Sequence, residues 1–352
     1  MIFREGMLLK TRAAINGFGR IGKNLLRIYF EKEKGKDIEI VAINSTSGPK
    51  AHAHLFKYDS IYGIFPGEVE ATDTSIIING KEIPFFSEDD PAKLPWNKMD
   101  VDVVFESTGK LRKKKDAERH LEAGAKKVII TAPSDDADIM IVMGVNHENY
   151  DKCKHNVVSA ASCTTNCLAP VVKVLNDRFK ILNGSLTTVH SYTADQRLVD
   201  KPHKDLRRAR SAGVSIIPTT TGAARAIGSV IPDLNGKLDG LAFRVPTPSV
   251  SVVDFVANVE KSVSVEEVND SFREASEKEL KGILGFTMEP LVSADFLKSP
   301  LSSVVDGLST MVIDERVVKV VSWYDNEYGY TCRVLDLAEY MINKEKASLT
   351  FK

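Results

Sequence analysis

The chain has 352 residues, of which 43% are hydrophobic and 27% charged, and its formal net charge is −1. This balance is that of an ordinary globular protein, and it gives no overall field that would attract nucleic acid or an anionic membrane. Four cysteines are too few for a disulfide framework. No apolar run reaches the roughly 18 residues of a membrane-spanning helix, so we expect a cytoplasmic protein.

The length exceeds that of a single core, which stops growing near roughly 250–300 residues, and therefore predicts two domains. Residues 1–10 contain charges but no apolar stretch of signal-peptide length. We expect them to form an N-terminal extension outside the folded domains, with Met7 as an alternative start.

The first half of the chain alternates short apolar runs with amphipathic stretches. Helical patterns cover Arg20–Glu33 and Lys113–Glu122, and Gly80 separates a hairpin of Ile76–Asn79 and Lys81–Phe85. Strand patterns rich in β-branched residues cover Ala13–Asn16, Ile40–Ile43, Val101–Glu106, Lys127–Thr131 and Ile139–Gly144. This alternation predicts a parallel sheet with helices on both faces.

From about Cys163 the pattern changes to one helix and several long strands. The helix is expected over Thr164–Phe179. A polar segment over Ser191–Pro218 has few helix or strand signals, and a loop of that length in a compact domain is usually functional. An amphipathic helix is predicted over Cys332–Ile342. The strands are expected at Ser185–His190, Leu241–Val245, Val250–Val259, Met311–Ile313 and Val317–Trp323.

Gly17-Phe-Gly-Arg-Ile-Gly22 matches the G-x-G-x-x-G pattern between a predicted strand and a predicted helix. The glycines allow a tight turn and close backbone approach, and the helix N-terminus offers N–H groups to a pyrophosphate. In that context the motif predicts dinucleotide binding, although a glycine-rich turn alone is often only a turn.

The fingerprint also expects an acidic residue after the second strand, to bind the ribose 2′-hydroxyl. Here that strand ends Ile43-Asn44-Ser45-Thr46, without Asp or Glu. Loss of the carboxylate removes repulsion against a 2′-phosphate and leaves hydroxyls that can bind it. A neutral turn that still accepts NAD is the alternative.

Cys163 lies at a predicted loop-to-helix junction, where the helix dipole favours a thiolate and lowers the pKa. Cys167 follows one turn later and is expected to be a small buried residue. Two cysteines four residues apart, with no further Cys/His pair, predict no zinc or other metal site. His190 ends a predicted strand and is the candidate base for the cysteine.

The segment Ala161-Ser-Cys-Thr-Thr-Asn-Cys-Leu-Ala-Pro170 resembles the active-site signature of the phosphorylating glyceraldehyde-3-phosphate dehydrogenases of the bacterial type. The likeness extends from Ile15-Asn-Gly-Phe-Gly-Arg-Ile-Gly22 to Trp323-Tyr-Asp-Asn-Glu-Tyr-Gly329, nearly the whole chain. It implies an α/β fold: a Rossmann-type doubly wound parallel sheet plus an α+β catalytic domain with a mixed or antiparallel sheet. The implied dinucleotide-binding domain is 11–162 with 328–352, and the catalytic domain is 163–327 with an S-shaped loop at about 191–218.

The resemblance implies that D-glyceraldehyde 3-phosphate is oxidised and phosphorylated to 1,3-bisphosphoglycerate, in glycolysis or gluconeogenesis. Cys163 would attack the aldehyde to form a thiohemiacetal, and His190 would take the hydroxyl proton as hydride leaves for NAD(P). Inorganic phosphate would then attack the resulting thioester. The resemblance also implies a homotetramer, whereas the lack of a long apolar run predicts no membrane partner.

The resemblance further implies two anion sites and a set of cofactor contacts. For the C3 phosphate of the substrate, the matching residues are Thr193, Asp195 and Arg244. For the attacking phosphate, they are Ser162, Thr164, Arg208, Thr221 and Gly222. For the cofactor, they are Asn16, Gly17, Gly19, Arg20, Ile21, Thr131 and Asn326.

The chain departs from the family's NAD-specific pattern in two places. Ser45 stands where that pattern has Asp, and Lys201 precedes a proline where it has Leu; both changes favour NADP or dual use. Asp89 replaces an arginine and acts in the opposite direction, because a carboxylate would repel a 2′-phosphate by about 1 kcal/mol if exposed. It is alternatively placed to bind a 2′-hydroxyl.

Two other functions fit parts of the sequence. An erythrose-4-phosphate dehydrogenase would hydrolyse the acyl-enzyme, but the complete phosphate-site set disfavours it. A non-catalytic dinucleotide-binding protein could bind RNA through the basic run Lys201–Arg210. The presence of both Cys163 and His190 argues against that function, so we do not expect nucleic-acid binding.

Overall fold

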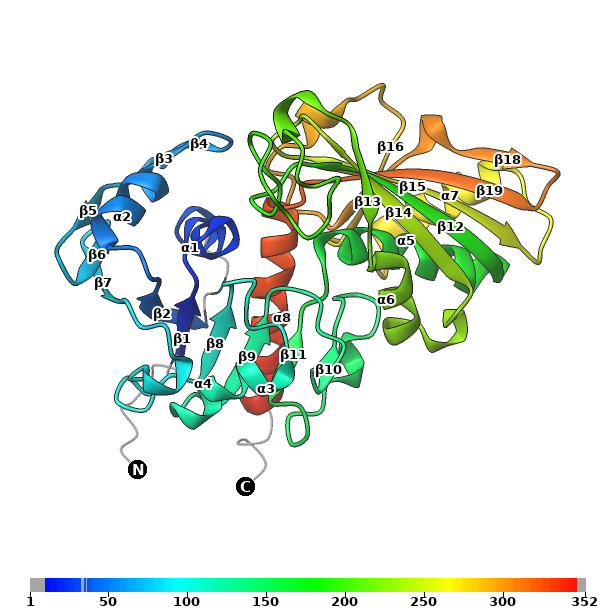
Figure 1. The fold of residues 1–352 in the computed structure, drawn as a ribbon. Helices are drawn as coiled ribbons and strands as arrows, with labels where there is room; N and C mark the ends of the chain where they lie inside the picture. The colour runs from blue at the N-terminus through cyan, green and yellow to red at the C-terminus, as the bar shows by residue number, and fades with distance from the viewer. Residues whose placement is uncertain (1–9, 33–34, 36, 347–352) are drawn as a thin grey trace. The chain divides into compact units, whose positions relative to one another are not determined.

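The computed structural model describes residues 10–32, 35 and 37–346. Packing divides the chain into two compact units (Figure 1). The first comprises the residues up to Met140, Tyr150–Ala160 and those from Val334 on; the second comprises Ile141–Asn149 and Ala161–Arg333. The predicted division was 11–162 with 328–352, and 163–327. Residues 1–9 of the predicted extension lie outside the described residues.

The first unit is built on a parallel sheet whose central strands run in the order β7-β2-β1-β8-β9. That order is the 3-2-1-4-5 arrangement of a Rossmann fold, in which ligands bind beyond the carboxyl ends of the strands. These strands are β1 (Thr11–Asn16), β2 (Ile38–Asn44), β7 (Lys81–Phe86), β8 (Val103–Glu106) and β9 (Lys127–Ile130).

The edges of this nine-stranded sheet extend it in two ways. On one side β7 pairs antiparallel with β6, and β6 pairs with β5, which confirms the predicted hairpin. On the other side β11 and β10 continue the parallel arrangement. The remaining strands and the helices of this unit are β3 (Tyr58–Asp59), β4 (Gly63–Ile64), β5 (Val69–Ala71), β6 (Ser75–Ile78), β10 (Ile139–Met140), β11 (Val157–Ser159), α1 (Arg20–Lys32), α2 (Pro49–Lys57), α3 (Lys114–Ala117) and α4 (Arg119–Glu122).

The second unit holds a mixed sheet in the order β13-β14-β12-β15-β19-β17-β16, with β18 paired to β19. The long helix α5 (Cys163–Phe179) packs against its strands β12, β15, β17 and β19. The strands are β12 (Ile181–Ser191), β13 (Ile217–Thr220), β14 (Leu238–Val245), β15 (Ser251–Val259), β16 (Leu284–Thr287), β17 (Ser303–Asp306), β18 (Met311–Ile313) and β19 (Val317–Tyr324). The other helices of this unit are α6 (Ala223–Val230) and α7 (Val265–Glu277). The helix α8 (Tyr328–Lys346) begins in the second unit and belongs to the first from Val334 on.

Burial explains why α5 forms despite Pro170 inside it. The helix is buried on most of its sides, and Leu168, Val171, Val172 and Leu175 are fully buried. A helix buried in this way belongs to the core, so packing offsets the hydrogen bond that the proline removes.

Three sequence predictions of local structure need correction. The predicted strand Ile139–Gly144 ends at Met140, because the side chain of Asn146 accepts the Val142 N–H (2.8 Å) and folds the segment into a turn. The helix predicted over Lys113–Glu122 is two short helices, interrupted at Glu118, which itself keeps helical φ and ψ.

The predicted loop Ser191–Pro218 is shorter than expected, because β13 begins at Ile217 and pairs antiparallel with β14. Pro218 fits there since β13 is an edge strand. Among the described residues, no helix is long and apolar enough to cross a membrane. Over the same residues, no cluster of three His, Cys, Asp or Glu side chains has a metal-binding arrangement.

Candidate active site

Cys163 is the first residue of α5, and Ser162 caps this helix. The Ser162 hydroxyl oxygen accepts the Thr165 N–H (2.9 Å) and lies 2.7 Å from the Thr165 hydroxyl. The backbone turns into the helix through Ala161, whose φ of 56° is in the left-handed region, and Tyr330 donates to the Ala161 carbonyl (3.0 Å). The cap thus holds the cysteine at the helix N-terminus, where N–H groups and the helix dipole favour negative charge.

His190 stands near the carboxyl end of β12, with its Nε2 3.5 Å from Cys163 Sγ. The two elements are joined behind this pair by Tyr324. Its hydroxyl lies 2.9 Å from the Thr164 hydroxyl on α5 and 3.0 Å from the Thr188 hydroxyl on β12. A nucleophile and a base are therefore within contact of one another on two rigid, mutually braced elements.

The other ring nitrogen of His190 has two competing neighbours. Nδ1 lies 2.7 Å from the Ser191 carbonyl oxygen and 2.7 Å from the guanidinium of Arg244, which also donates to that carbonyl (2.9 Å). Nδ1 can donate to the carbonyl or accept from the guanidinium, but not both. Only the first arrangement leaves Nε2 unprotonated and facing the sulfur as a base.

Burial and Arg244 set the charge states of this pair. Burial, and then the Arg244 cation, lower the pKa of His190 to about 3, so the imidazole is neutral. Burial raises the pKa of the Cys163 thiol, whereas Arg244 and hydrogen bonds at Thr164 lower it. The expectation that the helix terminus alone would lower this pKa omitted the burial of the sulfur. In this site, burial therefore favours the neutral forms of both side chains, the imidazole of His190 and the thiol of Cys163.

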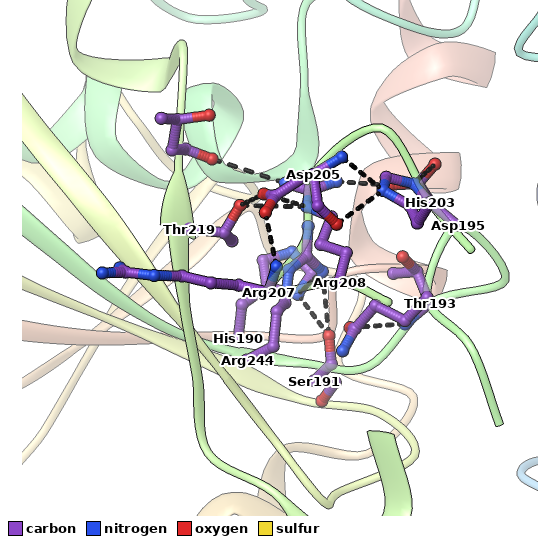
Figure 2. A network of polar contacts seen from close by, with 12 residues as sticks. His190, Ser191, Thr193, Asp195, His203, Asp205, Arg207, Arg208, Thr219 and Arg244 are labelled. Carbon is purple, nitrogen blue, oxygen red and sulfur yellow. Dashed lines mark hydrogen bonds and ion pairs between the residues drawn. The ribbon is translucent and has the colours of Figure 1, made fainter. Parts of the chain in front are cut away.

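Two arginines gather beside the histidine (Figure 2). Arg208 donates to Thr219 Oγ1 (3.0 Å), pairs with Asp195 and lies 3.6 Å from Asp205. Arg244 lies next to His190 and Ser191 in the same view, and its buried Nε–H has no hydrogen-bond partner among the described side chains and backbone. An unpaired donor on a cation next to a nucleophile is what an anionic substrate would satisfy.

The remaining residues predicted for the anion sites lie in the same unit. The Thr193 N–H donates to the side chain of Gln196 (3.3 Å). The Thr221 hydroxyl accepts the Ala223 N–H (3.2 Å), and Gly222 is the N-cap of α6, which packs on α5. The hydroxyls of Ser162 and Thr164 are already engaged, as a helix cap and with Tyr324.

The first unit contains a pocket at the carboxyl ends of its central parallel strands, as the topology predicts. Asn16, Gly17 and Gly19 of the glycine-rich turn line it. The other lining residues are Phe18, Asn44, Ser45, Thr46, Glu88, Asp89, Ser107, Thr108, Lys110 and Leu111. Residues predicted for cofactor binding from separate parts of the sequence, Asn16 and Ser45 among them, thus share one pocket.

Two glycines are required for this turn. Gly17 has φ +92°, and a Cβ there would stand 2.5 Å from the Thr108 backbone nitrogen. A Cβ on Gly22 would stand 2.2 Å from the Gly17 carbonyl oxygen. The first and last glycines of the motif therefore serve the close packing of strand, turn and helix, while Gly19 opens onto the pocket.

The other predicted cofactor residues of the first unit lie around this turn. Arg20 begins α1 and pairs with Asp59 (2.6 Å), and Ile21 follows it in the first turn of the helix. The Thr131 hydroxyl, just after β9, donates to the Glu106 carbonyl (3.1 Å).

In the second unit, Lys201 is exposed and its backbone N–H donates to the Ala209 carbonyl (3.0 Å). Asn326 is buried and accepts from Ser251 Oγ (2.9 Å). Ser251 Oγ in turn accepts the Ser191 N–H (3.0 Å), so a short chain of bonds connects Asn326 to the residue after His190.

Sequence reasoning missed Tyr324, Ser251 and Glu106, which connect the predicted residues. Tyr324 directly precedes Asp325-Asn326 in the motif Trp323–Gly329, and this position could have marked it as a residue of the site. Ser251 had no such signal, because an isolated serine at a strand start is common. Glu106 ends a predicted strand that pairs with the strand of Asn16, and a carboxylate at that edge of the sheet was a readable signal.

A Rossmann-type unit followed by a unit with a paired cysteine and histidine defines the class: a dinucleotide-linked oxidoreductase with a cysteine nucleophile. Two family models match the chain. The glyceraldehyde 3-phosphate dehydrogenase NAD binding domain matches residues 11–114, and the C-terminal domain of the same family matches 162–326.

Curated relatives match over almost their full length. A glyceraldehyde-3-phosphate dehydrogenase of Geobacillus stearothermophilus is 57% identical over 336 residues, 96% of this chain and 99% of the relative. Glyceraldehyde-3-phosphate dehydrogenase 1 of Bacillus cereus is 57% identical over 334 residues, 95% and 99% of the two chains. Glyceraldehyde-3-phosphate dehydrogenase 2 of Nostoc sp. is 54% identical over 334 residues, also 95% and 99%. The chain belongs to the glyceraldehyde-3-phosphate dehydrogenase family.

Proposed function

We propose that this chain oxidises D-glyceraldehyde 3-phosphate and phosphorylates the acyl group to give 1,3-bisphosphoglycerate, with NAD or NADP as hydride acceptor. The observation that carries the proposal is the contact of Cys163 Sγ with His190 Nε2 at 3.5 Å, at the N-terminus of a capped helix. Membership of the family makes the phosphorylating reaction the first one to test.

In the first step, sulfur attacks the aldehyde carbon, and His190 takes the thiol proton on Nε2 and passes it to the carbonyl oxygen, which becomes the hydroxyl of the thiohemiacetal. Since the pKa of His190 is lowered to about 3, the ring is neutral and free to accept the thiol proton. The imidazolium that forms is disfavoured by burial and by the Arg244 cation. A substrate phosphate bound to Arg244 would offset that repulsion, so substrate binding and proton transfer support one another.

Hydride acceptance at the nicotinamide ring is the chemistry that the dinucleotide would supply when bound. As the thiohemiacetal becomes a thioester, His190 Nε2 would take its hydroxyl proton. The pocket of the first unit has room for a dinucleotide. Gly19 lines this pocket, and the space beside it is open, since a Cβ added there would have no atom within 4 Å. On the protein side, the Cys163 backbone N–H is positioned by the helix terminus to stabilise the substrate oxygen.

In the last step, inorganic phosphate attacks the thioester carbon and the carbon–sulfur bond breaks. The leaving sulfur of Cys163 takes the proton from His190 Nε2, which restores both the thiol and the neutral imidazole. We assign the substrate phosphate to Arg244 with Thr193 and Asp195. We assign the attacking phosphate to Arg208 with Ser162, Thr164, Thr221 and Gly222. The Arg208–Asp195 ion pair connects the two sets, and a bound phosphate would compete with Asp195 for the guanidinium.

The decisive experiment measures NAD(P)H formation from the aldehyde with and without inorganic phosphate, together with the identity of the product. We expect phosphate-dependent turnover that Cys163→Ser abolishes, while Cys153→Ser, at an exposed cysteine, leaves it unchanged. A hydrolysed acid product formed without phosphate would contradict the phosphorylating reaction and indicate an erythrose-4-phosphate dehydrogenase activity instead.

For the cofactor we propose use of NADP as well as NAD. Ser45 supports NADP because no carboxylate stands at that position, and exposed Lys201 supports it through its charge. Asp89, which lines the Ser45 pocket, acts against it. The test compares kcat/KM for both dinucleotides in the native chain and in Ser45→Asp. A larger loss for NADP is expected, and equal losses would contradict the assignment.

We also propose self-association, as a homotetramer. Large apolar side chains in the loop after β12 are strongly exposed, and such a cluster on a single chain favours an interface; they are Leu198, Val199, Leu206, Val214 and Ile216. The basic run Lys201–Arg210 is partly neutralised by internal ion pairs of Arg208 and Arg210 with Asp195 and Asp200, which supports the absence of a nucleic-acid partner. Light scattering on the purified chain tests the tetramer.

A further inference from the structure

Ser45 is held by a histidine that no sequence motif indicated. Ser45 follows β2 and lines the dinucleotide pocket. Its N–H donates to the Phe86 carbonyl (3.0 Å), and its carbonyl accepts from Ser87 Oγ (3.1 Å), so the backbone is fixed on both sides. Its hydroxyl oxygen lies 2.9 Å from Nε2 of His52, a buried residue of α2.

The surroundings of His52 decide which atom of this pair donates. The ring lies 5.5 Å from both Phe18 and Phe85, and Nδ1 is buried with no hydrogen-bond partner among the described residues. A proton on Nδ1 would be a buried unpaired N–H, which proteins avoid more strictly than an unpaired acceptor. The proton therefore belongs on Nε2, which donates to Ser45.

The ring is also neutral near pH 7. Burial, and then the nearby Lys23 cation, lower the pKa of His52 to about 4. Lys23 itself is committed elsewhere, because its Nζ donates to the Phe18 carbonyl (2.6 Å). His52 thus offers Ser45 one N–H and no charge.

From this arrangement we infer that His52 is a positioning residue for dinucleotide specificity. By donating to the Ser45 oxygen, it leaves the single hydroxyl proton of Ser45 to donate to an acceptor in the pocket, and the acceptor chemistry that matches is a 2′-phosphate oxygen of NADP. This deepens the proposed function and rests on it.

The inference predicts unequal effects on the two dinucleotides. A hydrogen bond to a charged phosphate oxygen is about twice as strong as one to a neutral hydroxyl, so NADP gains more than NAD from an oriented Ser45 donor. Asp89 and Glu88 line the same pocket and repel a 2′-phosphate. A donor fixed in direction is what offsets this repulsion, and a freely rotating serine would do so less well.

The test is a double-mutant cycle of His52→Leu and Ser45→Ala in the full chain, with kcat/KM and calorimetric binding measured for NADP and NAD. His52→Leu should reduce kcat/KM for NADP about 3- to 10-fold, through KM, and for NAD less than about 2-fold, the range of one oriented hydrogen bond. In the Ser45→Ala background, His52→Leu should have no further effect on NADP.

Two more variants separate positioning from packing. His52→Gln, whose amide can donate from a similar place, should restore NADP use to within about 2-fold of the native chain. His54→Leu, at an exposed histidine of the same helix, should change nothing. Melting curves of each variant check that it is folded.

Equal losses for NAD and NADP, an undiminished effect of His52→Leu in the Ser45→Ala background, or no NADP binding by the native chain would each overturn the inference. Failure of the proposed function has a different signature: dinucleotides bind, but no phosphate-dependent aldehyde oxidation occurs. In that case the role of His52 is still decided by the double-mutant cycle, through the calorimetric binding of NADP and NAD.

Discussion

Glu106 offers the sharpest test of how the dinucleotide pocket is held in shape. This carboxylate ends β8 and is 1% exposed. It accepts from Asn16 Nδ2 (2.6 Å), from His120 Nε2 (3.0 Å) and from both the N–H (2.9 Å) and the hydroxyl of Thr108. Trp96 donates to His120 Nδ1 (3.0 Å), which leaves the His120 proton on Nε2. Every neighbour of the carboxylate is therefore a donor.

Glu106→Gln keeps the shape and turns one acceptor oxygen into a donor that faces other donors. The glutamine NH₂ group leaves two of these buried donors without an acceptor, and each unsatisfied donor costs about 1–3 kcal/mol, which gives about 2–6 kcal/mol in all. For a unit of this size, each kcal/mol lowers Tm by roughly 2–4 °C. We expect the first unit to melt about 4–24 °C lower. Because Asn16 and Thr108 line the pocket, dinucleotide binding should weaken as well.

The matched control is Glu39→Gln. Glu39 is a half-exposed carboxylate on β2 whose ion pairs are longer, 3.5 Å to Arg12 and 3.8 Å to Lys81. An exposed pair contributes about 0–1 kcal/mol, so its Tm should fall by no more than about 4 °C. Calorimetric melting of both variants provides the comparison. If Glu106→Gln melts no lower than the Glu39→Gln control, the reasoning is refuted.

Three further predictions concern catalysis and the glycine-rich turn. His190→Asn should lower kcat about 10²–10⁴-fold, the usual contribution of a general base, and a loss under 10-fold would rule out that role. Arg244→Met should move the pH profile of Cys163 alkylation, followed on that peptide by mass spectrometry, to higher pH, because Arg244 lowers the pKa of this thiol; an unchanged profile would contradict the coupling. Gly17→Ala should cost at least about 1–3 kcal/mol from its φ of +92° and abolish dinucleotide binding, whereas Gly213→Ala, which meets nothing within 4 Å, should be neutral.

The sequence predicted the features that repeat along the chain or form contiguous motifs. The glycine-rich turn, the capped cysteine helix and the strands around them carry local signals, and the parallel sheet follows from the alternation of strands and helices. Cys167 was expected to be buried and is fully so, with Sγ 3.4 Å from Ser303 Oγ. These predictions needed only residue type and spacing.

Features that depend on contacts between distant residues were not predictable in the same way. The end of β10 is decided by the Asn146 side chain, and the start of β13 by pairing with β14. The helix α6 and the long helix α7 were not assigned at all, although Ser264 and Glu267 form a capping box at the start of α7. That motif was a readable signal, whereas the burial of Cys163, which raises its pKa, was not.

Two histidines show why proton positions need the fold. Nδ1 of His52 has no partner among the described residues, so its tautomer is fixed and it serves as a permanent donor to Ser45. Nδ1 of His190 has two possible partners, the Ser191 carbonyl and the Arg244 guanidinium. The tautomer of His190 therefore depends on whether the guanidinium donates to Nδ1 or to another acceptor. An anion that draws Arg244 away leaves Nδ1 to donate to the carbonyl and frees Nε2 to act as a base toward Cys163. We therefore propose that the same side chain is a fixed donor in the first unit and a substrate-responsive base in the second, because of its neighbours alone.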